Sequence, residues 1–140
     1  MALEVFLTFN GNCREAVDFY AKVFKSSVEG LMTYSDAPPT DGYVAPEADK
    51  NKIMYANVNI CGSVVMFSDT PEGLPYAVGN NIVLNANVTE RAEVDRLFNE
   101  LNIDPDPHMP PQETFFADYY AMATDKFGVI WNIINMKESA

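Results

Sequence analysis

The sequence predicts an α+β protein built from two βαβββ modules, which form a cup-shaped mixed sheet with the helices outside. Three observations predict this class. Strand-like runs flank two amphipathic helical stretches, the order of elements in the first half recurs in the second, and a shift of 77 positions aligns the halves. We expect modules at residues 1–70 and 80–140 of a single domain spanning 1–140. Each module alone would leave one sheet face uncovered.

The first module begins with an apolar, aromatic-rich strand over Leu3–Phe9. Turn residues follow, and Asn12 has the chemistry of a helix N-cap, with Glu15 three residues later as in a capping box. Apolar residues at helical spacing predict a helix that continues to Phe24. A weaker strand is expected around Val28–Ser35, because a glycine interrupts it.

Two loops and a hairpin complete the first module. Asp36–Asn51 is rich in proline and glycine, and its length is typical of a lid. Ile53–Ile60 alternates between apolar and polar residues, and a tight turn leads into a strand over Ser63–Ser68. Asp69–Asn80 is a second Pro- and Gly-containing loop, at which we place the boundary between modules.

The second module repeats the pattern. Its expected elements, in order, are a strand over Ile82–Val88, an N-cap at Thr89, a helix over Glu90–Leu101, a Pro-rich loop over Asn102–Gln112, short strands near Thr114–Phe116 and Tyr119–Thr124, and a last apolar strand over Val129–Met136. Placing Asn12 over Thr89 brings identical residues together at Leu7 and Leu84, Asn10 and Asn87, Arg14 and Arg91, Val17 and Val94, and Asp18 and Asp95.

Composition excludes several classes of function. The formal net charge is −11, from 20 acidic and 9 basic side chains, which disfavours nucleic acids and anionic membranes. A single histidine excludes sites that need two, and two cysteines are too few for a disulfide scaffold. No signal peptide is recognisable, and no run approaches the roughly 18 apolar residues of a membrane helix. We therefore expect a cytoplasmic protein with reduced thiols.

Strand alternation predicts which side chains line the cup. If Met54, Val58, Ile82 and Leu84 pack against the helices, the opposite face carries aromatic, amide and small polar side chains. These cavity candidates are Phe6, Thr8, Tyr55, Asn57, Met66, Ser68, Asn81, Val83, Asn85, Tyr120, Met122 and Asn132. Such a lining suits a neutral or weakly polar organic ligand. The alternative is that these residues only fill a barrel-like interior.

Several segments spread over nearly the whole chain resemble the PhnB-like branch of the vicinal oxygen chelate superfamily, also labelled demethylubiquinone-methyltransferase-like. That superfamily includes glyoxalases, bleomycin-resistance proteins and extradiol dioxygenases. The segments are Phe9–Ala16 with Phe19-Tyr20, Lys52–Met54, Gly62-Ser63, Ser68–Pro71, Gly79–Ile82, and Thr124–Val129 with Trp131. The resemblance implies the glyoxalase/bleomycin-resistance fold, a cup-shaped cavity and a homodimer.

Superfamily enzymes hold a divalent metal at four strand positions. The matching residues here are Glu4 or Val5, Met66 (one register from Phe67), Asn81 or Ile82, and Asn132. The most favourable register supplies one carboxylate, two amides and a thioether, which is a poor set for Zn²⁺, Ni²⁺ or Fe²⁺. We therefore expect neither a metal nor another cofactor.

The branch's labels find little support in the residues. A phosphonate needs cations or a metal, and all nine basic residues fall on expected helices, loops or strand ends. No glycine-rich nucleotide loop follows a strand, as a cofactor-binding unit requires. Two single residues remain as reactive candidates. Cys13 would begin a helix, where the dipole lowers a thiol pKa, and His108 lies in the Pro-rich loop, within possible reach of the cup.

The leading interpretation is a PhnB-like protein that binds a small neutral or aromatic molecule in its cup without a metal. Its partners would be that ligand and a second copy of the chain, with neither nucleic acid nor membrane. The alternative is a metal-dependent lyase, isomerase or dioxygenase using Glu4 and water-bridged amides. A third interpretation is a structural module with a collapsed cup.

Overall fold

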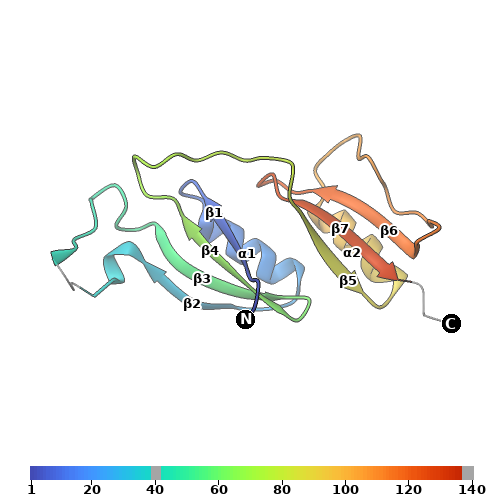
Figure 1. Ribbon diagram of the computed structural model, residues 1–140, viewed down its shortest axis with the longest axis horizontal. Helices are drawn as coiled ribbons and strands as arrows, with labels where there is room; N and C mark the ends of the chain where they lie inside the picture. The colour runs from blue at the N-terminus through green and yellow to red at the C-terminus, as the bar shows by residue number, and fades with distance from the viewer. Residues whose placement is uncertain (39–41, 137–140) are drawn as a thin grey trace. The chain divides into compact units, whose positions relative to one another are not determined.

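The computed structural model describes residues 1–38 and 42–136 of the chain. Figure 1 shows helices packed on one face of each of two sheets. The elements are β1 (Val5–Phe9), α1 (Cys13–Val23), β2 (Val28–Thr33), the 3₁₀ turn η1 (Tyr34–Asp36), β3 (Ile53–Ile60), β4 (Ser63–Asp69), β5 (Val83–Val88), α2 (Arg91–Leu101), β6 (Ala117–Thr124) and β7 (Ile130–Met136). The predicted α+β class with paired modules is confirmed.

The chain divides into two compact units, Met1–Ala77 and Val78–Ala140. Unit 1 contains a four-stranded sheet of order β1-β4-β3-β2, in which β1 runs parallel to β4 and the other pairs are antiparallel. Unit 2 contains a three-stranded sheet of order β5-β7-β6, in which β5 runs parallel to β7. In both units the first strand of the module therefore forms one edge of its sheet.

The core of unit 1 lies between α1 and one face of its sheet. Tyr20 of α1 is fully buried, and its ring stacks on Phe67 of β4 with centroids 5.7 Å apart. Phe67 lies beside Leu7 and Ala56 on the neighbouring strands, so these three side chains share the helix-facing side. Side-chain alternation then places Phe6 and Met66, which pair with each other, on the opposite side.

The core of unit 2 follows the same plan. Val94 and Leu97 of α2 are buried, and the sheet offers Trp131 and Ile133 of β7 as its largest buried side chains. The aligned repeat positions match in role, because Val17 and Val94 are both fully buried on their helices.

The turn between β6 and β7 is built around a buried carboxylate. Asp125 accepts hydrogen bonds from the backbone N–H groups of Phe127 (2.9 Å) and Val129 (3.0 Å) and from Trp131 Nε1 (2.9 Å). This carboxylate joins the turn to the largest side chain of the unit 2 core.

The expected strand near Thr114–Phe116 does not form. The Pro-rich loop after α2 instead runs beside β6, and Gln112 makes a single antiparallel bridge with Tyr120. Phe115 is 92% exposed, so the aromatic residues that favoured a strand there have no sheet face to cover. The second module is therefore βαββ, in contrast to the βαβββ order of the first.

Three predicted details at element ends are also wrong. The side chain of Asn12 does not cap α1, although Asn12 is its N-cap residue, and α2 is preceded by Glu90 as N-cap in place of Thr89. Strand β5 begins at Val83, so Asn81 lies outside it. Ile82, which was expected to pack against the helix, is 75% exposed. Local sequence signals place such boundaries only to within a few residues.

Candidate functional site

The sheet face opposite α1, which we call open face 1, gathers six of the predicted cavity residues. Phe6, Met66 and Asn57 form one cross-strand row, and Thr8 pairs with Ser68. Tyr55 lies two residues along β3 from Asn57, on the same side. The face is therefore aromatic, amide-bearing and uncharged at these positions.

A glycine makes room for the polar pair on open face 1. Asn57 Nδ2 donates to the hydroxyl of Tyr55 at 3.4 Å. Gly30 on β2 lies directly against this pair with a φ of +62°, and a Cβ there would come within 3.3 Å of Asn57 Nδ2 and 3.4 Å of the Tyr55 ring. Glycine adopts this backbone more readily than residues with a Cβ, so the residue that weakens β2 in the sequence leaves room for Tyr55 and Asn57.

The face opposite α2, which we call open face 2, gathers the other strand residues. Asn132 on β7 lies between Asn85 on β5 and Met122 on β6 in register, and Val83 and Tyr120 lie on the same side. Tyr120 donates its hydroxyl proton to Asn132 Oδ1 at 2.7 Å. Burial raises the pKa of Tyr120, so the hydroxyl keeps its proton and remains the donor.

Accessibility differs among the twelve candidates. Phe6, Thr8 and Asn85 are exposed, and Tyr55, Asn57, Met66, Val83, Met122 and Asn132 are half-buried. Ser68 and Tyr120 are each 8% exposed, so they contact neighbouring side chains and present little surface to a ligand. Asn81 is exposed but lies outside the sheet. Eleven of the twelve thus share the two open faces, as strand alternation predicts.

One contributor to open face 2 was missed in the sequence. Met109, in the loop before β6, packs against the cluster of Ala117, Tyr120 and Ile134. Its carbonyl accepts a hydrogen bond from the N–H of Met122 at 2.8 Å, which fixes the loop to the strand. Proline-rich loops carry no periodic signal, so no residue pattern indicates this contact.

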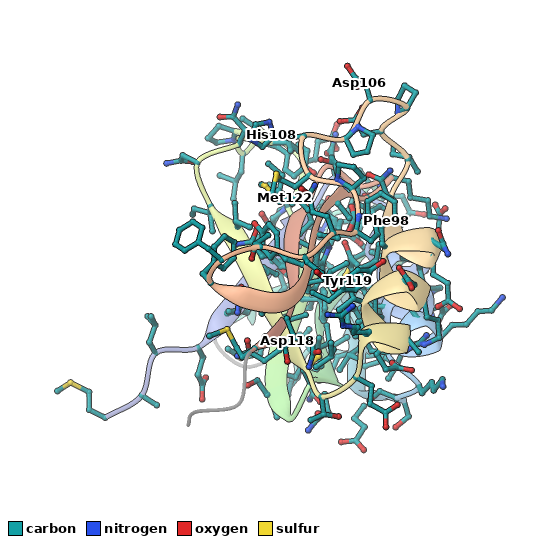
Figure 2. The ribbon with its side chains drawn as sticks, turned by 90° about the vertical axis from the view of Figure 1, so that its right-hand side faces the viewer. Phe98, Asp106, His108, Asp118, Tyr119 and Met122 are labelled. Carbon is teal, nitrogen blue, oxygen red and sulfur yellow. The ribbon has the colours of Figure 1, made fainter. Side chains whose placement is uncertain are left out.

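The two reactive candidates stand differently in the structure. Cys13 is fully buried, and desolvation together with the nearby Asp69 carboxylate raises its pKa to about 12, which rules against a thiolate nucleophile. His108 is exposed and follows Pro107 in the loop beside β6. In Figure 2 it lies toward the same end as Met122, whereas Tyr119 lies next to α2.

The residues at the superfamily's metal positions do not fit a metal. Met66 and Asn132 lie on open faces, but Val5 and Phe67 face the helix. Glu4 lines a pocket of about 330 Å³ whose other walls are apolar or hydroxyl side chains, from Leu3, Val5, Ser63, Val64 and Val65. Within the described parts of the chain, no group of three His, Cys, Asp or Glu side chains could hold a metal ion. A thioether and an amide cannot replace such a set.

The start of α1 is occupied by a carboxylate of the chain itself. Asp69 is 1% exposed at the end of β4, and its Oδ1 accepts hydrogen bonds from the N–H groups of Gly11 (2.9 Å) and Cys13 (3.0 Å). Its Oδ2 accepts from Ile53 N at 2.9 Å. A helix N-terminus after a strand is a common phosphate site, but here Asp69 already accepts from two of the N–H groups at that point, those of Gly11 and Cys13.

Comparison with known proteins gives the family. Residues 2–134 match the family model described as 3-demethylubiquinone-9 3-methyltransferase. The chain belongs to this family. It is 31% identical over 145 residues to Protein YjdN of Escherichia coli (strain K12), covering 99% of the chain and 97% of that protein. The resemblance to the PhnB-like branch is thereby confirmed.

Solved structures agree with this family assignment. Protein PA1353 from Pseudomonas aeruginosa is 34% identical, with a TM-score of 0.80 over 95% of this chain and 97% of that one. The PhnB protein from Bacillus cereus is 22% identical, with a TM-score of 0.75 over 96% and 98%. A glyoxylase/bleomycin resistance protein/dioxygenase domain from Frankia sp. EAN1pec, 13% identical, has a TM-score of 0.62 over 100% and 94%. The predicted glyoxalase/bleomycin-resistance fold is confirmed.

Two further features of this PhnB-like chain concern the charge of its strands and the length of its helices. No strand in the described parts of the chain contains Lys or Arg, so the open faces carry no cation for a phosphonate or phosphate. Across residues 1–38 and 42–136, no helix has both the length and the apolar character to cross a bilayer.

Proposed function

We propose that this PhnB-like protein binds a small neutral or aromatic organic molecule on its open faces, without a metal. The observation that carries the proposal is the polar lining of both faces. Each sheet turns one side to a helix and leaves the other with asparagine and methionine side chains that are half-buried or exposed. Half-buried amides add little to the stability of the fold, because water satisfies their hydrogen bonds equally well away from a sheet face.

The chemistry of the faces favours a neutral ligand. Aromatic rings and thioethers offer apolar contact area, and asparagine amides offer one donor and one acceptor group each. Neither face offers a cation to an anionic ligand. The proposal extends to a homodimer, as the family resemblance implies, and to a cytoplasmic location, as expected for a chain with two cysteines and no disulfide scaffold.

A pair of matched charge variants tests ligand binding. Asn85→Lys places a charge on open face 2, whereas Asn99→Lys makes the same change on the exposed side of α2. A library of neutral aromatic compounds is screened by thermal shift in EDTA, and the binders are measured by calorimetry. We expect Asn85→Lys to weaken binding by about tenfold or more, since a desolvated charge opposes an apolar ligand, and Asn99→Lys to leave it within about twofold. A screen with no binder would contradict the proposal.

Elemental analysis tests the metal-free part of the proposal. Protein purified without chelator should hold far less than one equivalent of any transition metal, because the available donors are a thioether and amides. Stoichiometric metal that disappears in Glu4→Ala would overturn this part and favour the metal-dependent alternative.

A further inference from the structure

Open face 2 presents three side chains in one straight row across its strands. Asn85, Asn132 and Met122 are neighbours in register on β5, β7 and β6. Adjacent strands lie about 4.8 Å apart, so the two amides stand side by side at that spacing. A small planar molecule lying on this face would touch both amides at once.

The two amides are oriented by their own hydrogen bonds. Asn132 Oδ1 accepts from the Tyr120 hydroxyl, which leaves its Nδ2 as the group available to a ligand. Asn85 donates through Nδ2 to Asn87 Oδ1 at 3.0 Å, which leaves its Oδ1 as an acceptor. In the described parts of the chain no buried side-chain polar atom lacks a partner, so these remaining groups are open to solvent. The row therefore presents a donor beside an acceptor.

An apolar wall borders this donor and acceptor. Met109 and Met122 each pack against the cluster that contains Tyr120, and the hydrogen bond from the N–H of Met122 to the carbonyl of Met109 joins their two segments. Thioether side chains adapt to flat ring surfaces and make favourable sulfur–aromatic contacts. The wall thus suits a ligand ring that carries the polar group bound to the two amides.

We propose that open face 2 recognises planar lactams and carboxamides, whose C=O accepts from Asn132 Nδ2 while the adjacent N–H donates to Asn85 Oδ1. The ring then rests against Met109 and Met122. This inference rests on the proposed function and narrows it to one class of ligand. Tyr120 acts as a positioning residue, because its hydroxyl fixes which edge of the Asn132 amide faces the ligand.

Three bicyclic probes of nearly equal shape test the inference. 2-Quinolinone carries both the C=O and the N–H, N-methyl-2-quinolinone lacks the N–H, and quinoline lacks both. Calorimetry on the full chain should show 2-quinolinone binding about tenfold more tightly than either of the others, as expected for one or two neutral hydrogen bonds.

Side-chain variants locate the effect. Asn85→Leu should abolish the preference for 2-quinolinone over its N-methyl derivative, and Asn99→Leu on α2 should keep it. Tyr120→Phe should reduce the preference several-fold while leaving the affinity for quinoline unchanged, since the ring wall persists and only the Asn132 orientation is lost. A loss of quinoline binding equal to the loss of 2-quinolinone binding would contradict the positioning role.

The outcomes separate this inference from the proposed function. Equal affinities for the three probes, or an unchanged preference in Asn85→Leu, would overturn the lactam assignment. The same holds if none of the probes binds while other neutral aromatics do, and the proposed function would then stand. If no neutral compound binds at all, the proposed function itself is overturned.

Discussion

At the scale of single residues, the buried carboxylate of Asp69 connects the end of β4 to the start of α1 and to β3. The spacing of Asn12 and Glu15 predicts a local capping box, but the N–H groups at the start of α1 bond to Asp69, 56 positions away from Cys13. A local pattern can show that a helix begins there, but it cannot show which remote side chain accepts hydrogen bonds from the N–H groups at its start. Asp69 has no recognisable signal in the sequence beyond following an apolar strand.

Removal of this carboxylate should destabilise unit 1 strongly. Asp69→Ala leaves the N–H groups of Gly11, Cys13 and Ile53 without their acceptor in a buried setting, which we expect to cost about 3 kcal/mol or more. Asp36→Ala removes an exposed carboxylate that accepts a hydrogen bond from the backbone N–H of Thr33, and it should have a much smaller effect. Urea denaturation measures both, and equal losses would contradict the role of Asp69.

At the scale of elements, strands with clear alternation were predicted well and loops were not. The alternation of Ile53–Ile60 correctly divides that strand between helix side and open side, because a sheet buried on one face requires it. The segment Thr114–Phe116 is rich in aromatic residues but lies outside the sheet. Gln112 in the preceding Pro-rich loop pairs with the edge of β6 instead. Which segment reaches an edge depends on loop paths that residue patterns do not encode.

The long loop proposed as a lid is anchored near its end. Asp49 is 2% exposed, forms an ion pair with Lys52 (3.0 Å) and accepts from the N–H of Glu72 (2.9 Å) in the next loop. The Glu72 hydrogen bond, followed by that of Lys52, holds the pKa of Asp49 below its ordinary value of 3.8. The two loops of unit 1 are thus joined through one carboxylate.

This anchor predicts a specific dependence on pH. Because the pKa of Asp49 is lower in the folded state, its contribution to stability is complete above about pH 5 and disappears as the pH falls through the folded-state pKa. The difference in Tm between the native chain and Asp49→Asn should therefore be constant from pH 5 to 8 and shrink below pH 4. A difference that persists unchanged at pH 2 would show that the charge is not the cause.

At the scale of the whole molecule, the internal repeat predicts more of the structure than the metal chemistry of the resembled superfamily does. The 77-position shift aligns core residues on both helices and places the open faces correctly on both sheets. It does so because burial of one face imposes a fixed period on each copy. The hydrogen bond that orients Asn132 comes from Tyr120 on the neighbouring strand, and no periodicity within one strand shows such a bond.

The net charge predicts discrimination against anions. With −11 overall and no cation on the open-face strands of the described chain, a carboxylate ligand meets repulsion that salt screens. The affinity for the 4-carboxylate of 2-quinolinone should be well below that for 2-quinolinone at 10 mM NaCl, and the gap should narrow toward 500 mM. Calorimetry at several salt concentrations measures it, and a gap independent of salt would assign the discrimination to local contacts.

The position of Asp69 has one more consequence, for ligands that carry phosphate. Any free anion that seeks the N–H groups at the start of α1 must displace a carboxylate tethered to the adjacent strand. A tethered group of this kind competes at a raised effective concentration, because its binding is intramolecular. Asp69 is in this sense a resident anion of the chain, and it competes with phosphorylated compounds for the N–H groups of Gly11 and Cys13.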